Sequence, residues 1–302
     1  MEALELTNLP LEFKDWLKTK KDNDYWLVPD VPFDSAIQKF NYYTNKLKEK
    51  KLKCRQVTWF VTNKCNLSCV HCGVSANDRL FKDLTLEEFS QITPQLKKIG
   101  VEFITLSGGE ALLRKDIVEV ITFLKENGFK VGLVTNATYL TKKLQKLGKN
   151  IPDSISISID GLEENHFLIR QNKSNYKTAI KAIKEAKELG VNIISVATCV
   201  YPHNLKDLEE LKTTLFEAGI DQWVLRAITP SGRASEKQNY FLDKQQIKDL
   251  LIYIKNNIEN GYDITVGADL GYLGKLDSSI YLYPYFCTVG WDSFVILPNG
   301  DI

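Results

Sequence analysis

From residue 56 onward, the sequence alternates short β-branched runs with longer amphipathic segments, and this alternation constrains the fold more than any other feature. Six strand–helix pairs in succession predict a parallel sheet, because each buried strand is followed by a covering helix before the next strand begins. The predicted strands cover residues 56–61, 103–107, 130–135, 154–159, 192–199 and 222–227. The predicted helices cover residues 85–98, 115–127, 141–147, 176–189, 205–218 and 244–260. The fold class is therefore α/β, with the sheet curled into a barrel or left open.

The two ends of the chain do not follow this alternation. A length of 302 residues allows one large α/β domain with extensions. Residues 1–53, with a helix-like stretch at 33–50, are expected to form a small N-terminal helical appendage, and residues 54–260 the repeated domain. Residues 261–302 are expected to form an incomplete β extension, with short strands over 281–286 and 294–301 and an Asn-Gly turn at the end.

The composition is that of an ordinary globular protein, with 44% hydrophobic and 25% charged residues and a net charge of +1. Such a charge gives no argument for nucleic acid or for an anionic membrane surface. No apolar run approaches the roughly 18 residues that a membrane-spanning helix needs. The first five residues, Met1 to Glu5, lack the basic start and apolar core of a secretory signal peptide. We therefore predict a cytoplasmic protein with no nucleic-acid or membrane partner.

Three of the six cysteines, Cys65, Cys69 and Cys72, are clustered with C-x3-C-x2-C spacing directly after the first predicted strand. Three thiolates this close together can hold three corners of a 4Fe–4S cube and leave the fourth iron open to a small molecule. A disulfide and a structural zinc site are the alternatives. A disulfide requires an oxidising compartment, and zinc requires a fourth ligand, for which His71 is poorly placed between two of the cysteines.

Polar residues and glycines follow several of the other predicted strands. In parallel α/β folds, functional sites gather at the C-terminal ends of the strands. The segments that end there are the cysteine loop, Ser107-Gly108-Gly109-Glu110, Thr135-Asn136, Asp160-Gly161, Cys199 and Arg226. The sequence therefore predicts a site at this rim of the sheet.

The cysteine loop, the Gly-Gly-Glu turn and the β/α repeat together resemble the radical S-adenosylmethionine (SAM) enzymes, over about residues 56–227. The resemblance implies a partial (β/α)6 TIM-like barrel that binds one 4Fe–4S cluster through Cys65, Cys69 and Cys72. It also implies that SAM chelates the open iron and is cleaved reductively to a 5′-deoxyadenosyl radical, which abstracts hydrogen from a substrate. A pure iron–sulfur electron carrier without catalysis is the alternative from another class.

Several residues are expected to contact SAM. Gly108 and Gly109 would let backbone carbonyls approach the cationic amine, and Glu110 would add negative charge. Ser158 and Asp160 are two residues apart, so strand alternation is expected to point both toward the ribose and the methionine end. For each of these two segments a plain turn is the alternative.

Three further SAM contacts are carried over from the resemblance. Arg170 matches an arginine that pairs with the cofactor carboxylate, although Gln171 replaces the usual glycine after it. Asn136 fits a Thr-Asn signature after the third strand, with a helix N-terminal turn as the alternative. His71 occupies a position where relatives often carry an aromatic residue that meets the adenine. Cys199 is a candidate hydrogen donor to a substrate radical, with an inert buried thiol as the alternative.

The remaining candidates are weaker. Tyr139, Arg226 and Arg233 are possible substrate contacts, each with an ordinary packing or surface alternative. His166 and His203 are expected in loops without a role, and Cys54 is expected to do nothing chemical.

Near the C-terminus, Cys287-Thr288-Val289-Gly290-Trp291 and residues 296–302 resemble the opening of a SPASM domain. In many radical enzymes that modify peptides, this extension carries auxiliary clusters. Cys287 alone cannot hold a cluster that takes four thiolates, so we expect one cluster in this chain and an incomplete SPASM-type extension. The resemblance favours a ribosomally made peptide as substrate, with a porphyrin-like or other small molecule of the haem-pathway type as the alternative. It also implies an electron donor such as flavodoxin or ferredoxin and, because the N-terminal appendage is short, a separate peptide-recognition protein.

Overall fold

The computed structural model describes residues 41–302, except 43, 47, 50–52, 79–81, 282–284 and 286. Most of the predicted N-terminal appendage and most of the strand predicted over 281–286 lie outside these residues. Within 41–48, the described residues are helical, as predicted. The part of the chain described here contains no helix that combines the length and the apolar composition needed to cross a bilayer.

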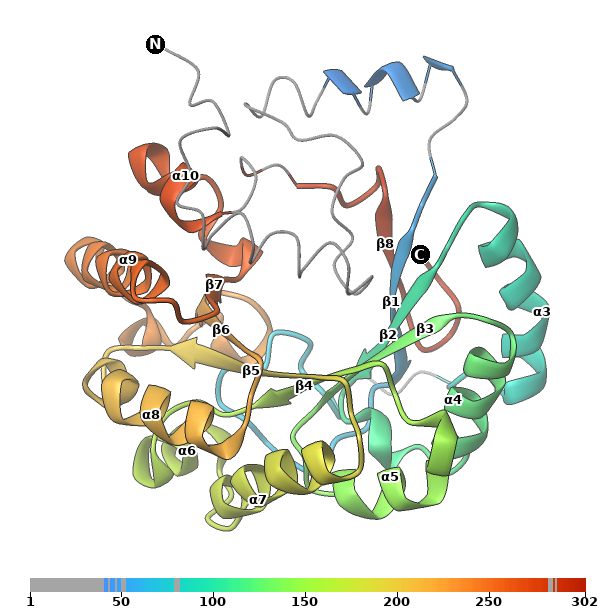
Figure 1. Ribbon diagram of the computed structural model, residues 1–302, viewed down its shortest axis with the longest axis horizontal. Helices are drawn as coiled ribbons and strands as arrows, with labels where there is room; N and C mark the ends of the chain where they lie inside the picture. Colours follow the sequence, from blue (N-terminus) through green and yellow to red (C-terminus); the bar gives the residue numbers. More distant parts are fainter. Residues whose placement is uncertain are drawn as a thin grey trace.

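The fold is an α/β structure built on one parallel sheet, which confirms the predicted fold class. The strands run in the order β7-β6-β5-β4-β3-β2-β1-β8, and every ladder between neighbours is parallel. Their bounds are β1 Gln56–Thr62, β2 Phe103–Gly108, β3 Lys130–Thr135, β4 Ser154–Ser158, β5 Ile193–Val200, β6 Gln222–Ala227, β7 Ile264–Val266 and β8 Ser293–Ile296. The sheet curves without closing, so β7 and β8 remain as its two edges (Figure 1).

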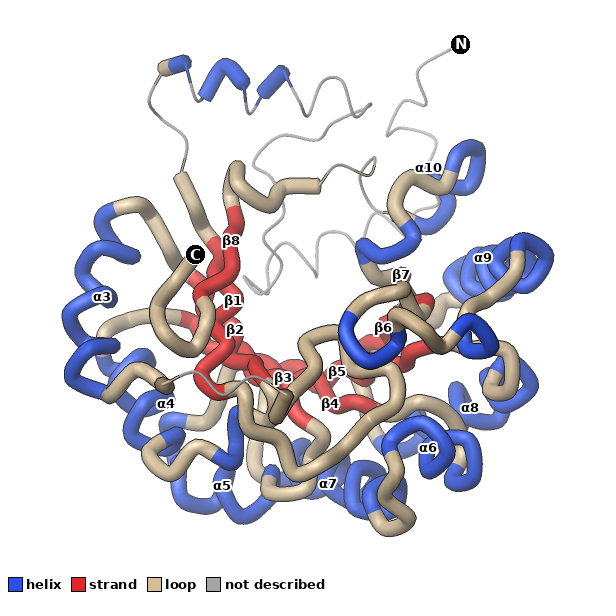
Figure 2. Tube along the Cα trace, turned by 180° about the vertical axis from the view of Figure 1, so that it is seen from behind, coloured by secondary structure: helices blue, strands red, loops and turns tan. Residues whose placement is uncertain are grey.

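Helices cover the outer, convex side of this curved sheet (Figures 1 and 2). They are α3 Leu86–Lys98, α4 Ile117–Glu126, α5 Leu140–Leu147, α6 Glu163–Arg170, α7 Asn175–Glu188, α8 Leu208–Ala218, α9 Lys244–Glu259 and α10 Asp277–Ile280. All six predicted helices are present. The expectation that His166 lies in a loop is wrong, because this residue belongs to the short helix α6. The apolar residues of α6 are consecutive, so its sequence has no helical period.

Buried and partly exposed side chains alternate along the strands, so one face of the sheet packs against the helices and the other face is open. In β4, Ile155 and Ile157 are fully buried in the core, whereas Ser154, Ser156 and Ser158 are partly exposed. Successive residues of a strand point to opposite faces, so the serines share the face away from the helices. A closed barrel fills this face with bulky side chains, whereas β4 presents only small hydroxyl groups on it.

The last strand, β8, lies beside β1 and not beside β7. Gln56 pairs with Ser293, and the backbone after β8 turns at Gly300, whose φ of +92° favours glycine. The predicted Asn-Gly turn is therefore present, closed by a hydrogen bond from the Leu297 N–H to the Asp301 carbonyl at 2.8 Å. As a result, β1, which leads into the cysteine loop, is an interior strand paired on both sides.

Candidate functional site

A cavity of about 170 Å³ lies at the C-terminal ends of β1 to β4. Its lining comes from the cysteine loop after β1, the Gly-Gly-Glu turn after β2 and the ends of β3 and β4, with Arg170 from α6 and Arg233 from the loop after β6. One water needs roughly 15 Å³ on this measure, so the cavity is much larger than a site for a bare ion. Every predicted metal or SAM residue except Asp160 lines it, and the candidate donor Cys199 does not.

The cysteine loop is shaped by its own hydrogen bonds. The backbone N–H groups of Leu67 and Ala76 donate to the sulfurs of Cys65 and Cys72, both at 3.4 Å. The side chain of Asn77 holds Cys65 from both sides, accepting from its N–H at 2.9 Å and donating to its carbonyl at 3.0 Å. Asn77 itself has a φ of +73°, a conformation that asparagine tolerates better than most residues. Sequence reasoning missed this residue.

The three thiols suit an iron–sulfur cluster. Burial raises the pKa of Cys65 to about 11 and also raises the pKa of Cys69, so these groups are protonated thiols until iron displaces the protons. Two buried nitrogens, His71 Nδ1 and Arg233 Nη2, have no hydrogen-bond partner within the described part of the chain. Both residues line the cavity, so a polar ligand there would supply the missing partners. The donor set and the cavity therefore fit a cluster with a bound cofactor.

The glycines of the Gly-Gly-Glu turn are required by the backbone of the cysteine loop. A Cβ on Gly108 would lie 2.2 Å from the Thr62 carbonyl oxygen, and one on Gly109 would lie 2.3 Å from that of Lys64. The Gly109 N–H donates to Thr62 and the Glu110 N–H donates to Lys64, both at 2.8 Å. The turn after β2 thus sets the start of the cysteine loop directly.

Glu110 fastens this turn to the end of β3. Its buried carboxylate accepts from the Thr135 hydroxyl and the Asn136 N–H, both at 2.8 Å, and from the Leu112 N–H at 3.1 Å. Burial raises the pKa of the Glu110 carboxyl in spite of these donors. The Asn136 side chain in turn donates to Asn66 at 2.9 Å, which ties β3 to the cysteine loop.

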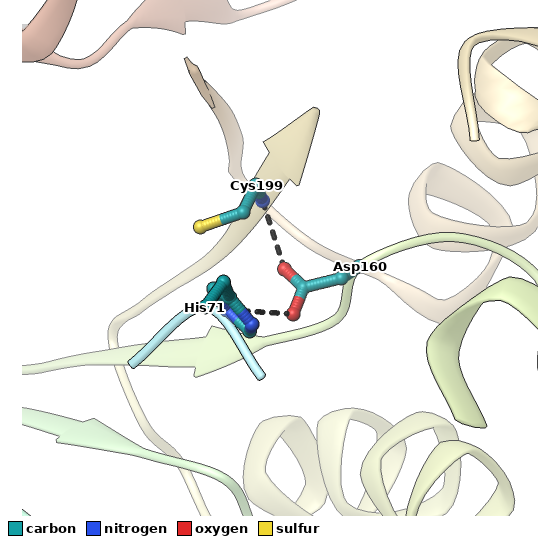
Figure 3. A group of neighbouring side chains, drawn as sticks. All are labelled: His71, Asp160 and Cys199. Atoms are coloured by element: carbon teal, nitrogen blue, oxygen red, sulfur yellow. Dashed lines mark hydrogen bonds and ion pairs between the residues drawn. The ribbon is translucent and has the colours of Figure 1, made fainter. Parts of the chain in front are cut away.

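Asp160 is fully buried behind the cavity and binds the residues that line it. Its Oδ2 accepts from Arg170 Nε at 2.7 Å and lies 3.3 Å from His71 Nε2, while its Oδ1 accepts from the Cys199 N–H at 2.8 Å (Figure 3). Burial alone would raise the pKa of the Asp160 carboxyl, but Arg170 and His71 hold it below its usual value. Asp160 therefore carries a negative charge that positions Arg170. Asp160 does not itself line the cavity, but the two side chains that its Oδ2 contacts, Arg170 and His71, line it together with Ser158.

The polar atoms of His71, Asp160 and Cys199 lie within 4.8 Å of one another. Arg170 already neutralises the Asp160 carboxylate, so a cation at this point would compete with a buried guanidinium. The sulfur of Cys199 points away from the carboxylate (Figure 3). Burial raises the pKa of this thiol, which keeps it protonated.

The remaining residues considered from the sequence include several that lie outside the cavity. His166 is fully buried, accepts from the Asp160 N–H at 3.0 Å through Nδ1, and pairs with Asn175 through Nε2 at 2.9 Å. Arg226 pairs with Asp269 at 2.9 Å and does not line the cavity. Neither Cys54 nor Cys287 lines it, and Cys54 donates to the Asp292 carbonyl at 3.3 Å.

The parallel α/β sheet and the three thiols at its C-terminal rim define an iron–sulfur protein with room for a bound cofactor. The family model of the radical SAM superfamily matches residues 59–215, or 157 of 302 residues. The chain belongs to the radical SAM superfamily. Enzymes of this superfamily use a 4Fe–4S cluster and SAM, so the predicted enzyme class and both predicted cofactors are confirmed.

Several characterised proteins are similar to the chain. Fe-coproporphyrin III synthase of Methanosarcina barkeri is 28% identical over 201 residues, which are 65% of this chain and 50% of that protein. The subtilosin biosynthesis protein AlbA of Bacillus subtilis is 24% identical over 248 residues, 81% of this chain and 53% of AlbA. The chain thus spans about half the length of these relatives.

Among solved structures, SuiB of Streptococcus suis, bound to its precursor peptide SuiA, shares the fold with a TM-score of 0.67 at 17% identity. The match covers 96% of this chain and 71% of SuiB.

Proposed function

We propose that this chain cleaves SAM reductively at the cavity described above and directs the resulting radical to a peptide substrate. The observation that carries the proposal is the convergence of Cys65, Cys69 and Cys72 on one cavity, beside the Gly-Gly-Glu turn. When bound, the cluster and SAM supply a 5′-deoxyadenosyl radical that abstracts hydrogen from the substrate. The other cysteines are not needed for this cluster.

The protein residues bind and orient SAM. Arg170 provides a fixed cation for the cofactor carboxylate, because Asp160 holds its Nε at 2.7 Å and leaves the rest of the guanidinium at the cavity. The hydroxyl of Ser158 suits a ribose hydroxyl, and His71 suits the adenine through its ring. The carbonyls of the turn at Gly108 and Gly109 suit the cofactor amine, with Glu110 and Asn136 bracing that turn.

A peptide substrate is supported by the open face of the sheet. Ser158 lines the cavity, and the residues on the same face of the neighbouring strands include Ser156 and Ser195, which pair directly in the β4–β5 register. Small hydroxyl side chains leave space and hydrogen-bonding groups for a polar chain. AlbA, a bacteriocin biosynthesis protein, and SuiB, which binds a precursor peptide, are further support. Cys199 lies on this face of β5, so a role as hydrogen donor requires a substrate that extends beyond the cavity.

The second candidate substrate is a porphyrin-like molecule, favoured by the 28% identity to Fe-coproporphyrin III synthase. The peptide remains the first candidate because the match to AlbA covers 81% of this chain, against 65% for the match to Fe-coproporphyrin III synthase. An electron donor such as flavodoxin or ferredoxin, and a separate peptide-recognition protein, belong to the same proposal.

The substrate proposal can be tested with the reconstituted protein, SAM and a reductant. The candidate substrates are a short peptide encoded beside the gene for this chain and, in parallel, iron coproporphyrin. With the peptide uniformly deuterated in one reaction and the porphyrin in the other, we expect deuterium in 5′-deoxyadenosine from the peptide reaction alone and a mass change in the peptide. Deuterium transfer from the porphyrin and none from the peptide would reverse the choice of substrate. Undeuterated product in both reactions would contradict both substrates while leaving SAM cleavage intact.

A further inference from the structure

We propose that the segment Ser231–Ala234, after β6, is a strap that clamps the cysteine loop, and that Arg233 positions the cluster and tunes its reduction. This inference rests on the proposed binding of the cluster by Cys65, Cys69 and Cys72. It assigns a role to Arg233, which lies more than 150 positions from the cysteine loop along the chain. From the sequence, substrate contact and an ordinary packing or surface position were the two interpretations of this residue.

The backbone of the strap touches the loop at its third cysteine. The Arg233 N–H donates to the Cys72 carbonyl at 3.0 Å. A Cβ on Gly232 would lie 2.3 Å from this same oxygen and 2.6 Å from the Gly73 carbonyl oxygen. Gly232 also has a φ of +54°, so both the contact and the turn require glycine.

The side chain of Arg233 then spans the loop. Its Nε donates to the Cys69 carbonyl at 2.9 Å, and its Nη1 donates to the Ala76 carbonyl at 2.7 Å. Together with the backbone bond to Cys72, one residue holds three carbonyls of the loop. A planar guanidinium can do this with a fixed geometry that a lysine cannot reproduce.

The positive charge of Arg233 lies beside the cysteine loop that would hold the cluster. A cluster held by three thiolates carries negative charge, and reduction adds one more electron. A fixed cation and hydrogen-bond donors nearby favour the reduced form, because cluster potentials depend on net charge and on hydrogen bonds. The buried Nη2 has no partner in the described part of the chain and belongs to a residue that lines the cavity. It therefore remains available to a cluster sulfide or to the bound cofactor.

The strap can be tested by comparing Arg233→Gln, Arg233→Lys and Arg226→Gln in the anaerobically reconstituted full chain. Arg226→Gln is the matched control, since it removes the same charge from the end of β6 but outside the cavity. The readouts are the midpoint potential of the cluster, its retention against an iron chelator, and its electron paramagnetic resonance spectrum with and without SAM.

For Arg233→Gln we expect a more negative potential and a loss of iron affinity of about 10- to 100-fold, as is typical when a residue supporting metal ligands is lost. In Arg233→Lys the midpoint potential should lie between those of the wild type and Arg233→Gln, because lysine keeps the positive charge. Iron retention should stay as low as in Arg233→Gln, because lysine lacks the planar guanidinium that binds several loop carbonyls at once. If Arg233→Gln keeps the wild-type midpoint potential and the wild-type retention of iron, the proposed role of Arg233 is wrong. It is also wrong if Arg226→Gln shifts the midpoint potential as much as Arg233→Gln does. Failure of the wild-type chain to take up any cluster would instead overturn the proposed function on which the strap rests.

Discussion

At the residue scale, Asp160 fixes the positions of side chains that line the cavity, although its own side chain does not line it. The carboxylate is fully buried and contacts Arg170, His71 and the backbone of Cys199, which come from three different segments. Arg170 is nearly buried as well, so each of these two charges depends on the other for compensation. Removing one member of such a pair leaves an uncompensated charge in a medium of low polarity.

We therefore expect Asp160→Asn to lower the free energy of unfolding by about 3–5 kcal/mol, the cost typical of breaking a buried pair from one side. The binding of SAM should weaken as well, because Arg170 loses its fixed position. Urea unfolding and equilibrium binding measure the two effects. Glu102→Gln is the control, since it removes the exposed partner of Arg55 and should cost less than about 1 kcal/mol. Equal stability losses in the two variants would contradict the structural role of Asp160.

His166 predicts a dependence of stability on pH. Burial, reinforced by Arg170, lowers its pKa to about 4, so the ring is neutral in the folded protein at pH 7. In the unfolded chain histidine titrates near 6.5, so between these values the unfolded state binds more protons and acid favours unfolding. Stabilisation by this group is present above about pH 6.5 and is lost as the pH falls toward 4.

Between pH 7 and about pH 4.5, His166 should account for roughly 2–3 kcal/mol of the lost stability. Urea unfolding of His166→Gln at both pH values should show a smaller loss than wild type, because glutamine keeps polar atoms but does not titrate. His203→Gln, at an exposed position, should behave like wild type. An unchanged pH dependence in His166→Gln would show that this ring does not control acid stability.

At the element scale, the cysteine loop is set by its neighbours as much as by its own sequence. The turn after β2 approaches the loop backbone so closely that Gly109 admits no Cβ. Glu110 then joins this turn to β3. The ends of β1, β2 and β3 are therefore joined by direct contacts. A change at the end of β2 or β3 displaces the thiols of the cysteine loop after β1.

The substitution Gly109→Ala should for this reason reduce cluster assembly, because its Cβ would lie 2.3 Å from the Lys64 carbonyl and force the loop to move. Iron per chain after anaerobic reconstitution is the measurement. Gly128→Ala serves as the control: its Cβ meets nothing within 4 Å, and its φ of +76° should cost only about 1 kcal/mol of stability. Full iron loading of Gly109→Ala would mean that the loop tolerates this shift.

Part of this fold and site could be predicted from local sequence patterns, and part depends on contacts between residues far apart in the chain. Period and spacing are local signals, and they located all six strands of the repeat and the three clustered cysteines. Together with the family resemblance, which supplied Arg170, Asn136 and His71, the sequence predicted ten of the residues that line the cavity. Local patterns did not reveal α6, which has no helical period, or the contacts of the buried Asp160 with Arg170 and the backbone of Cys199. The contacts of Arg233 join residues up to 164 positions apart and leave no local pattern.

At the scale of the whole molecule, two edge strands extend the sheet of six predicted strands, which remains open. β7 was not predicted, whereas β8 overlaps the short strand predicted over 294–301. The cavity lies at the ends of the strands nearest β1, and three of the six cysteines line it. Cys54, Cys199 and Cys287 lie elsewhere, the last of them exposed. This distribution predicts a single cluster.

Chemical analysis of iron and sulfide after anaerobic reconstitution should accordingly give about four of each per chain, the content of one 4Fe–4S cluster. Cys287→Ala should retain that value, because its thiol does not line the cavity. A content near eight irons per chain, lowered by Cys287→Ala, would mean that the C-terminal segment helps to hold a second cluster.

The most direct test of the central claim is the formation of 5′-deoxyadenosine from SAM by the reconstituted protein in the presence of a strong reductant. We predict product that depends on the reductant, disappears in Cys65→Ala, Cys69→Ala and Cys72→Ala, and persists in Cys54→Ala and Cys287→Ala. Absence of product from a wild-type protein that carries its full cluster would contradict the account.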